Sequence, residues 1–226
     1  MADHSRQASI SPYSYVANNP IQYFDPTGMI WEDPKQAEWL NAAINNRIES
    51  IEKNSTKIQT QIDKGDLSDK KLAKLENRLE DNKSKINNLN QSLLDIEAIG
   101  NAAETYRLTG PSRSDGTHRV VKGADGVINI EGSTTGLHIH EIRHVGQSIE
   151  AGGVKFNKDG RLLNAAKVIN GDYSKVYNNE INAYKVQYSF DGSYPMGVSS
   201  LGDINVNSLR EIKDKNGNYI YRFEKK

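Results

Sequence analysis

The segment from residue 140 to residue 144, with the sequence HEIRH, carries three side chains that could act together in metal chemistry. If the segment is helical, His140 and His144 lie on one face, four residues apart, and both imidazoles can bind one metal ion. Glu141 then lies beside a water bound to that metal, where a carboxylate can act as a general base. The chain contains no cysteine, so its metal ligands are expected to be histidines and carboxylates.

Glu180 is the predicted third ligand, because a catalytic zinc ion takes three ligands from the protein and keeps one position open. It begins a Glu-x-x-Ala pattern inside residues 174–190, a stretch that can be helical throughout. A HExxH motif followed by Glu-x-x-Ala resembles the gluzincin zinc peptidases, in which a second helix supplies the glutamate of a His2Glu site. The resemblance implies a Zn2+ metallopeptidase with His140, His144 and Glu180 as metal ligands and Glu141 as general base.

A hydrogen-bond donor near the metal is expected to stabilise the oxyanion that develops during hydrolysis. Tyr184 heads the candidates, because it shares a predicted helix face with Glu180. Tyr177 and His118 are alternatives, and the sequence does not choose among the three. Arg143 occupies an inner position of the motif where many residue types are tolerated, so it is expected to be a salt-bridge partner or an exposed charge rather than a catalyst.

Two further positions bear on the geometry of the metal site. Asp172 or Asn182 could orient a ligand imidazole by a hydrogen bond from outside the ligand set. His138 and His140 alternate as they would on a strand, and a His-x-His metal site of the cupin kind would use that alternation. Such a site needs a β-barrel, whereas the chain offers few strands. His138 is therefore expected at the rim of the site, one turn from the metal.

The elements expected around the motif begin with a β-hairpin. Its strands are predicted at residues 119–122 and 127–130, around the turn Gly123-Ala124-Asp125-Gly126. A polar link then leads into the motif helix, predicted from Leu137 to about Gln147. Zinc peptidases of the HExxH type place a short sheet immediately before the motif helix, and the edge strand of that sheet aligns the peptide substrate. The order of elements here agrees with that plan.

The C-terminal stretch predicts a short helix near residues 207–212. A second hairpin is predicted to overlap it, with strands at residues 210–213 and 219–223 around the turn Asp214-Lys215-Asn216-Gly217. No catalytic chemistry is assigned to either element.

Two long helices joined by a short turn are predicted between residues 33 and 100. Asp33 followed by Pro34 marks the start of the first, and Lys64-Gly65-Asp66 separates it from the second. Leucine and isoleucine recur at steps of three and four in both helices, interrupted by Ser55 in the first and Asn82 in the second. A polar residue in such a seam fixes its register, so the pattern predicts an antiparallel coiled-coil hairpin acting as spacer or recognition arm.

The run SPYSYVANNPIQYFDPTGM at residues 11–29 is dense in turn formers and aromatic residues. It resembles the closing segment of the Rhs/YD-repeat core, the shell of large polymorphic toxins. In that family the motif Pro-x-x-x-x-Asp-Pro-x-Gly-Leu ends the shell and a variable toxin follows. The residues that match this motif are Pro20, Asp25, Pro26 and Gly28, with Met29 in place of leucine.

The Rhs resemblance implies that everything from Ile30 onward is a toxin payload. It marks Met29–Ile30 as the candidate self-cleavage bond, with Asp25 and Asp3 as candidate carboxylates. It also implies a secreted effector, exported by a type VI or related system, that acts inside a target cell. The expected partners are the Rhs shell, a peptide or protein substrate in the target cell and a cognate immunity protein.

The composition sets limits on function. Lysine plus arginine equals aspartate plus glutamate, so the formal net charge is zero, which argues against a nucleic-acid partner. No apolar run approaches the length that spans a bilayer. A hydrophobic content of 36% and a charged content of 26% are typical of a solvated helical segment beside a smaller folded core.

The sequence therefore predicts an α+β chain of 226 residues in three parts. They are a Rhs-core terminal segment at 1–29, a coiled-coil helical hairpin at 30–103 and a small zincin-like metallopeptidase domain at 104–226. Two alternatives remain open: a nuclease-like or other non-peptidase toxin, and a non-enzymatic binding module, each with a coincidental HExxH motif.

Overall fold

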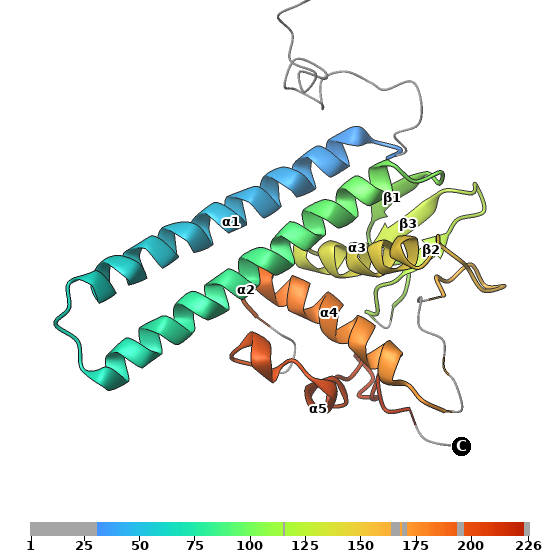
Figure 1. The fold of residues 1–226 in the computed structure, drawn as a ribbon. Helices are drawn as coiled ribbons and strands as arrows, with labels where there is room; N and C mark the ends of the chain where they lie inside the picture. The colour runs from blue at the N-terminus through green and yellow to red at the C-terminus, as the bar shows by residue number, and fades with distance from the viewer. Residues whose placement is uncertain (1–30, 115, 164–167, 169–170, 194–196, 224–226) are drawn as a thin grey trace, which may run out of the picture.

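The computed structural model describes residues 31–114, 116–163, 168, 171–193 and 197–223 and has the predicted α+β class. The leader at residues 1–29 and the Met29–Ile30 bond lie outside the described residues. Long helices and a small sheet surround the motif helix (Figure 1). The elements in chain order are α1 Pro34–Asp63, α2 Asp69–Gly100, β1 Tyr106–Thr109, β2 Val120–Lys122, β3 Ile128–Glu131, α3 Thr135–Glu150, α4 Ser174–Asp191, η3 Leu201–Asp203 and α5 Val206–Leu209.

The two long helices α1 and α2 lie side by side and are joined by a short turn (Figure 1). Asp33 caps α1 as predicted, because its side chain accepts a hydrogen bond from the backbone N–H of Lys35 at 3.0 Å. The two polar residues that interrupt the apolar stripes face each other: Asn82 Nδ2 donates to Ser55 Oγ at 2.9 Å. That bond satisfies both polar groups and fixes the register of the two helices.

The sheet contains three strands in the order β1-β3-β2. The predicted hairpin is confirmed, since β2 and β3 pair antiparallel with Lys122 opposite Ile128. Strand β1 was not expected, and it pairs with β3 in parallel, with Tyr106 opposite Ile128. The outer side of β2 is also bonded, because Lys122 N–H donates to Gly160 O and Leu162 N–H donates to Val120 O. Residues 160–162 therefore occupy the outer edge of β2, and the expectation that an edge strand of this sheet aligns a peptide substrate stays a prediction.

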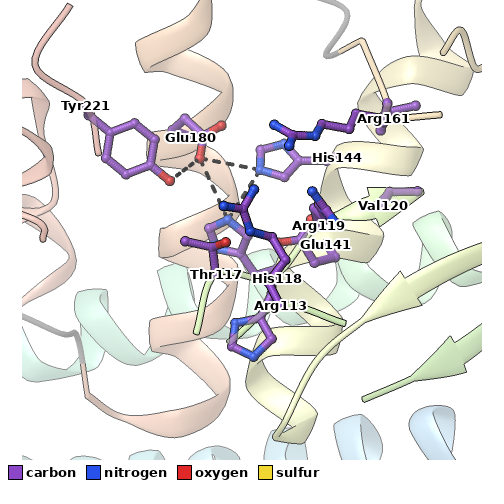
Figure 2. Close-up of a pocket in the computed structure, with 12 residues that line it drawn as sticks. Arg113, Thr117, His118, Arg119, Val120, Glu141, His144, Arg161, Glu180 and Tyr221 are labelled. Carbon is purple, nitrogen blue, oxygen red and sulfur yellow. Dashed lines mark hydrogen bonds and ion pairs between the residues drawn. The ribbon is translucent and has the colours of Figure 1, made fainter. Parts of the chain in front are cut away.

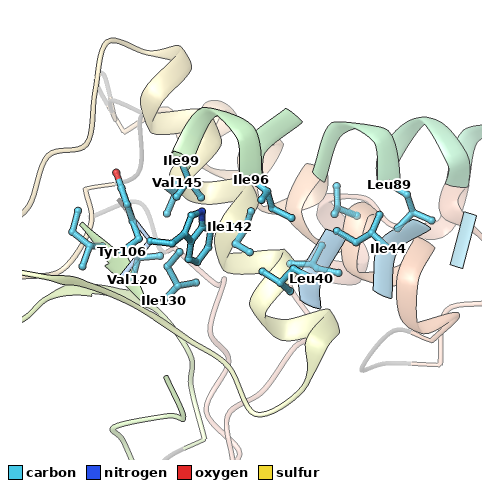
Figure 3. Packing of buried hydrophobic residues seen from close by; sticks show 14 of the residues in the cluster. Leu40, Ile44, Leu89, Ile96, Ile99, Tyr106, Val120, Ile130, Ile142 and Val145 are labelled. Carbon is cyan, nitrogen blue, oxygen red and sulfur yellow. The ribbon is translucent and has the colours of Figure 1, made fainter. Parts of the chain in front are cut away.

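One hydrophobic core joins the hairpin, the sheet and the motif helix (Figure 3). Ile139, Ile142 and Val145 of α3 are fully buried against Ile96 and Ile99 of α2 and against the sheet. The predicted boundary between residues 103 and 104 thus runs through a shared core, and the division into domains stays a prediction. A second cluster packs α4 on the C-terminal stretch; its buried members are Tyr177, Tyr184, Tyr188, Leu201, Ile204, Leu209 and Ile212.

The C-terminal stretch forms less regular structure than predicted. The expected short helix is present as α5, and Asn205 caps it through bonds from the backbone N–H groups of Asn207 and Ser208. The expected hairpin shrinks to a single bridge between Lys213 and Tyr219. Among the helices that the structure describes, none combines the length and apolarity needed to cross a membrane.

Candidate metal centre

Helix α3 carries the HEIRH motif and is fixed at both ends. Thr134 caps its start by accepting a hydrogen bond from Leu137 N–H at 3.2 Å. Near its end, Gly146 lies so close to the Asp95 carboxylate of α2 that a Cβ atom there would collide with it. The Arg143 guanidinium donates to Asp95 at 2.6 Å and to Glu150 at 3.0 Å. Of the two expectations for Arg143, the salt-bridge partner is confirmed and the exposed charge is wrong.

The three predicted ligands come together between α3 and α4 (Figure 2). His140 Nε2 lies 3.2 Å from His144 Nε2 and 3.7 Å from Glu180 Oε2, and His144 Nε2 lies 3.4 Å from the same oxygen. A tetrahedral zinc ion with bonds of about 2.0–2.1 Å holds its ligand atoms about 3.3–3.4 Å apart. The measured separations bracket that spacing, so these two nitrogens and one oxygen fit a divalent cation.

Gln147 orients one of the imidazoles, a role that the sequence did not suggest for it. Its Oε1 lies 3.0 Å from His144 Nδ1, and its Nε2 donates to the backbone carbonyl of Asn179 on α4 at 3.1 Å. A proton on Nδ1 that bonds to this amide oxygen leaves Nε2 free to bind a metal. The sequence spacing could have indicated this role, because Gln147 follows His144 by three residues on the same helix face.

The residues proposed for orienting an imidazole lie elsewhere. Asp172 accepts a hydrogen bond from Ser174 N–H at the start of α4, and Asn182 is exposed. Neither has a recorded hydrogen bond to His140 or His144 among the described residues. Gln147 is the residue that makes such a bond.

Tyr221, from the C-terminal stretch, makes a direct contact with the ligand set that the sequence did not reveal. Its hydroxyl donates to Glu180 Oε2 at 2.8 Å. Tyr184 packs its ring against His140, with the ring centroids 4.4 Å apart, and its hydroxyl lies 3.2 Å from that of Tyr221. Tyr177 instead donates to the backbone carbonyl of Tyr221 at 2.8 Å, so it supports that segment.

The other two histidines of the site region differ in position. His138 Nε2 is bonded to the backbone carbonyl of Thr109 at 3.1 Å and takes no part in the ligand cluster. Because His138 and His140 lie on a helix, the His-x-His strand site of the cupin kind is wrong. His118 lines the cavities beside the cluster, and its Nε2 lies 3.2 Å from Ser133 Oγ.

The pKa values of the ionisable groups in the cluster are strongly shifted by burial and by the charges of the neighbouring groups. Burial raises the pKa of Glu141 to about 8, and the nearby charge of His144 only partly opposes it. Burial also acts on Glu180, but the charge of His144 and the hydrogen bonds of both imidazoles outweigh it and hold the Glu180 pKa well below its usual range. For His144 the charge of Glu180 outweighs burial and raises the pKa to about 9. Such opposed shifts are typical of functional sites.

Two cavities adjoin the cluster, with volumes of about 270 and 260 Å³. Both are lined by His140, Glu141 and Tyr221. The cluster therefore lies where a molecule occupying either cavity can reach it, and Glu141 faces both. Comparison with models of known families, with curated proteins and with solved structures gave no match.

Proposed function

We propose that this protein is a zinc-dependent peptidase whose active site is the cluster of His140, His144 and Glu180 with Glu141. The observation that carries the proposal is the spacing of the three ligand atoms, 3.2 to 3.7 Å, in the presence of a buried carboxylate that lines the same cavities. Two imidazoles and one carboxylate are the donor set of a catalytic zinc site with one position left for solvent. The sheet before α3 and the third ligand on α4 are consistent with a zincin-like arrangement.

In this proposal Glu141 acts as the general base. A zinc ion held by the three ligands would lower the pKa of water and polarise a substrate carbonyl. Glu141 accepts a proton from the water whose oxygen bonds to the carbonyl carbon. As the C–N bond breaks, Glu141 delivers that proton to the leaving amine. Glu141 lines both cavities beside the three ligands, which places its carboxylate where it can reach such a water.

Two tyrosines are proposed to help stabilise the oxyanion that forms from the substrate carbonyl. Tyr221 donates to Glu180 Oε2 and lines both cavities, so its hydroxyl is a donor next to the place where charge develops. Tyr184, the first candidate from the sequence, bonds to Tyr221 through its hydroxyl and packs on His140. Tyr221 has one hydroxyl proton, which Glu180 Oε2 accepts in this structure, so we propose that the proton turns to the oxyanion when a metal binds that oxygen, and that Tyr184 positions Tyr221.

The proposed biological role is supported by the leader segment alone. The resemblance of residues 11–29 to the end of an Rhs core supports a toxin payload that is delivered into a target cell and neutralised by an immunity protein. In the same proposal, α1 and α2 form a coiled-coil arm of the payload. Expression of residues 30–226 in a bacterial cytoplasm should arrest growth, and the Glu141→Gln variant should not. Equal toxicity of the two proteins would assign the toxic effect to something other than hydrolysis at this site.

Metal analysis and peptide hydrolysis together test the enzymatic proposal. The purified protein should contain one zinc ion per chain, which a double variant, His140→Ala with Glu180→Ala, should lack. His138→Ala is the matched control: it removes an imidazole from the same helix but outside the cluster, so zinc should remain. Glu141→Gln should keep zinc and lose at least about 100-fold in hydrolytic rate. A correctly folded wild-type protein that binds no zinc would overturn the proposal.

A further inference from the structure

Three arginines line the cavity of about 270 Å³ beside the ligand cluster. Arg113 comes from the loop before β2, Arg119 directly precedes β2, and Arg161 belongs to the segment bonded along the outer side of β2. Figure 2 shows their side chains gathered around the space next to His144 and Glu141. Segments far apart in the sequence thus bring three guanidinium groups to one side of the proposed reaction centre.

The described residues that line this cavity include two carboxylates, Glu141 and Glu180, whose charge the divalent cation of the proposed site would offset. Arg119 has a partner in the buried carboxylate of Glu131, 3.7 Å away. Arg161 is exposed and forms no ion pair with another described residue. A loaded site therefore presents the positive charge of Arg161 to whatever enters the cavity. Guanidinium groups bind carboxylates through paired, charge-assisted hydrogen bonds.

The second cavity, of about 260 Å³, has a different lining. Leu137, Ile212 and Ile220 contribute apolar surface there, together with Tyr184. Lys213, Asp214 and Lys215 bring charges of both signs to the same cavity. A peptide that reaches from one cavity into the other past Glu141, which lines both, therefore meets guanidinium groups in the first and mainly apolar groups in the second.

We propose that the arginine-lined cavity is a subsite for an acidic side chain of the substrate, adjacent to the bond that is cleaved. The substrate class is then a peptide with aspartate or glutamate on one side of the scissile bond and an apolar residue on the other. This inference rests on the proposed peptidase function. A free C-terminal carboxylate carries the same chemistry, and the experiment separates the two sources.

The cleavage arm uses the zinc-loaded wild-type protein and two matched peptide libraries, one blocked at both ends and one with a free C-terminus, with the products identified by mass spectrometry. Cleavage should concentrate at bonds flanked by aspartate or glutamate at one fixed position. For a cleaved peptide and its matched Gln analogue, Arg161→Gln should lower kcat/KM about 10- to 100-fold for the acidic peptide only. Arg78→Gln, which removes the same charge from α2, should change neither value. Cleavage confined to peptides with a free C-terminus would overturn the side-chain assignment.

A binding arm keeps failure of the subsite distinguishable from failure of the peptidase proposal. The probe is N-acetyl-glutamate amide, compared with N-acetyl-glutamine amide, added to zinc-loaded Glu141→Gln protein. The arginine Nε–H signals in NMR spectra should shift with the acidic probe alone, and Arg161→Gln should abolish one of them. Binding without hydrolysis of any peptide would retain the subsite and refute the peptidase. Hydrolysis without acidic preference, and with no effect of Arg161→Gln, would retain the peptidase and refute the subsite.

Discussion

Asp95 should make the stability of this protein fall as the pH rises from 4 to 7. Its carboxylate is 2% exposed between α2 and α3 and accepts a bond from Arg143 at 2.6 Å. Burial raises the Asp95 pKa from 3.8 to about 6, although the Arg143 charge lowers it. Burial prevails because Arg143 divides its charge between Asp95 and Glu150. Among the described residues, the second carboxylate oxygen of Asp95 also has no hydrogen-bond partner.

The sign and the size follow from linkage between protonation and folding. Between pH 3.8 and pH 6 the folded state holds a proton on Asp95 that the unfolded state has released, so the free energy of unfolding decreases as the pH rises. The contribution is fully present below pH 3.8 and is lost as the pH rises through about 6. The difference between the two pKa values corresponds to about 3 kcal/mol.

An Asp95→Asn variant isolates this contribution. Its amide keeps an oxygen that can accept from Arg143, but it cannot titrate. Urea unfolding of both proteins in EDTA, at several pH values from 4 to 7, should show the variant gaining about 3 kcal/mol relative to wild type. EDTA prevents the pH dependence of metal binding from entering the comparison. Asp66→Asn, in the exposed turn between α1 and α2, controls for removal of a charge. Parallel curves for Asp95→Asn and wild type would mean that the ion pair outweighs burial, which would refute this account.

Two further predictions concern residues around the ligands. Gln147→Ala removes the bond to His144 Nδ1 and should weaken zinc binding about 10- to 100-fold in a competition with a chelator; unchanged affinity would show that the amide does not set the orientation of the imidazole. Tyr221→Phe removes the donor to Glu180 Oε2 and, if Tyr221 stabilises the oxyanion, should lower kcat roughly 100-fold with zinc content unchanged. Tyr188→Phe is the control, because it removes a hydroxyl that donates to Ser199 O away from both cavities, and an equal loss in both variants would indicate a structural effect instead.

The approach of His140, His144 and Glu180 to one another was predictable because all three predicted ligands lie on helices whose periodicity the sequence indicates. Two histidines four residues apart share a face wherever the segment is helical, and Thr134 and Gly146 allow α3 to form and to pack closely. The register of the two long helices could be predicted from the sequence for a similar reason. Ser55 and Asn82 interrupt apolar stripes at positions that the packing of two helices brings together.

The features that the sequence did not reveal depend on tertiary contacts. Tyr221 lies in an irregular segment, and its contact with Glu180 depends on tertiary bonds from Tyr177 to its backbone and from Tyr184 to its hydroxyl. Strand β1 is four residues long, and its parallel pairing with β3 is a contact across more than twenty residues that no local pattern records. The three arginines of the cavity are likewise assembled by the pairing of residues 160–162 with β2.

The helical hairpin has two parts with different consequences for the site. Toward the end of α2, Ile96 and Ile99 pack behind the fully buried Ile142 of α3, and Asp95 binds Arg143 directly beside the ligand His144. This packing holds α3, and with it the two imidazoles, in place, because separating the helices would expose the apolar face of α3 to water. The far end of the hairpin extends away from the sheet (Figure 1). Near it, Ile58 and Leu75 are buried but belong to neither of the hydrophobic clusters that pack around α3 and α4. The near end therefore packs as one unit with the helices of the candidate metal site, whereas the far end lies outside that packing and could serve as the proposed arm.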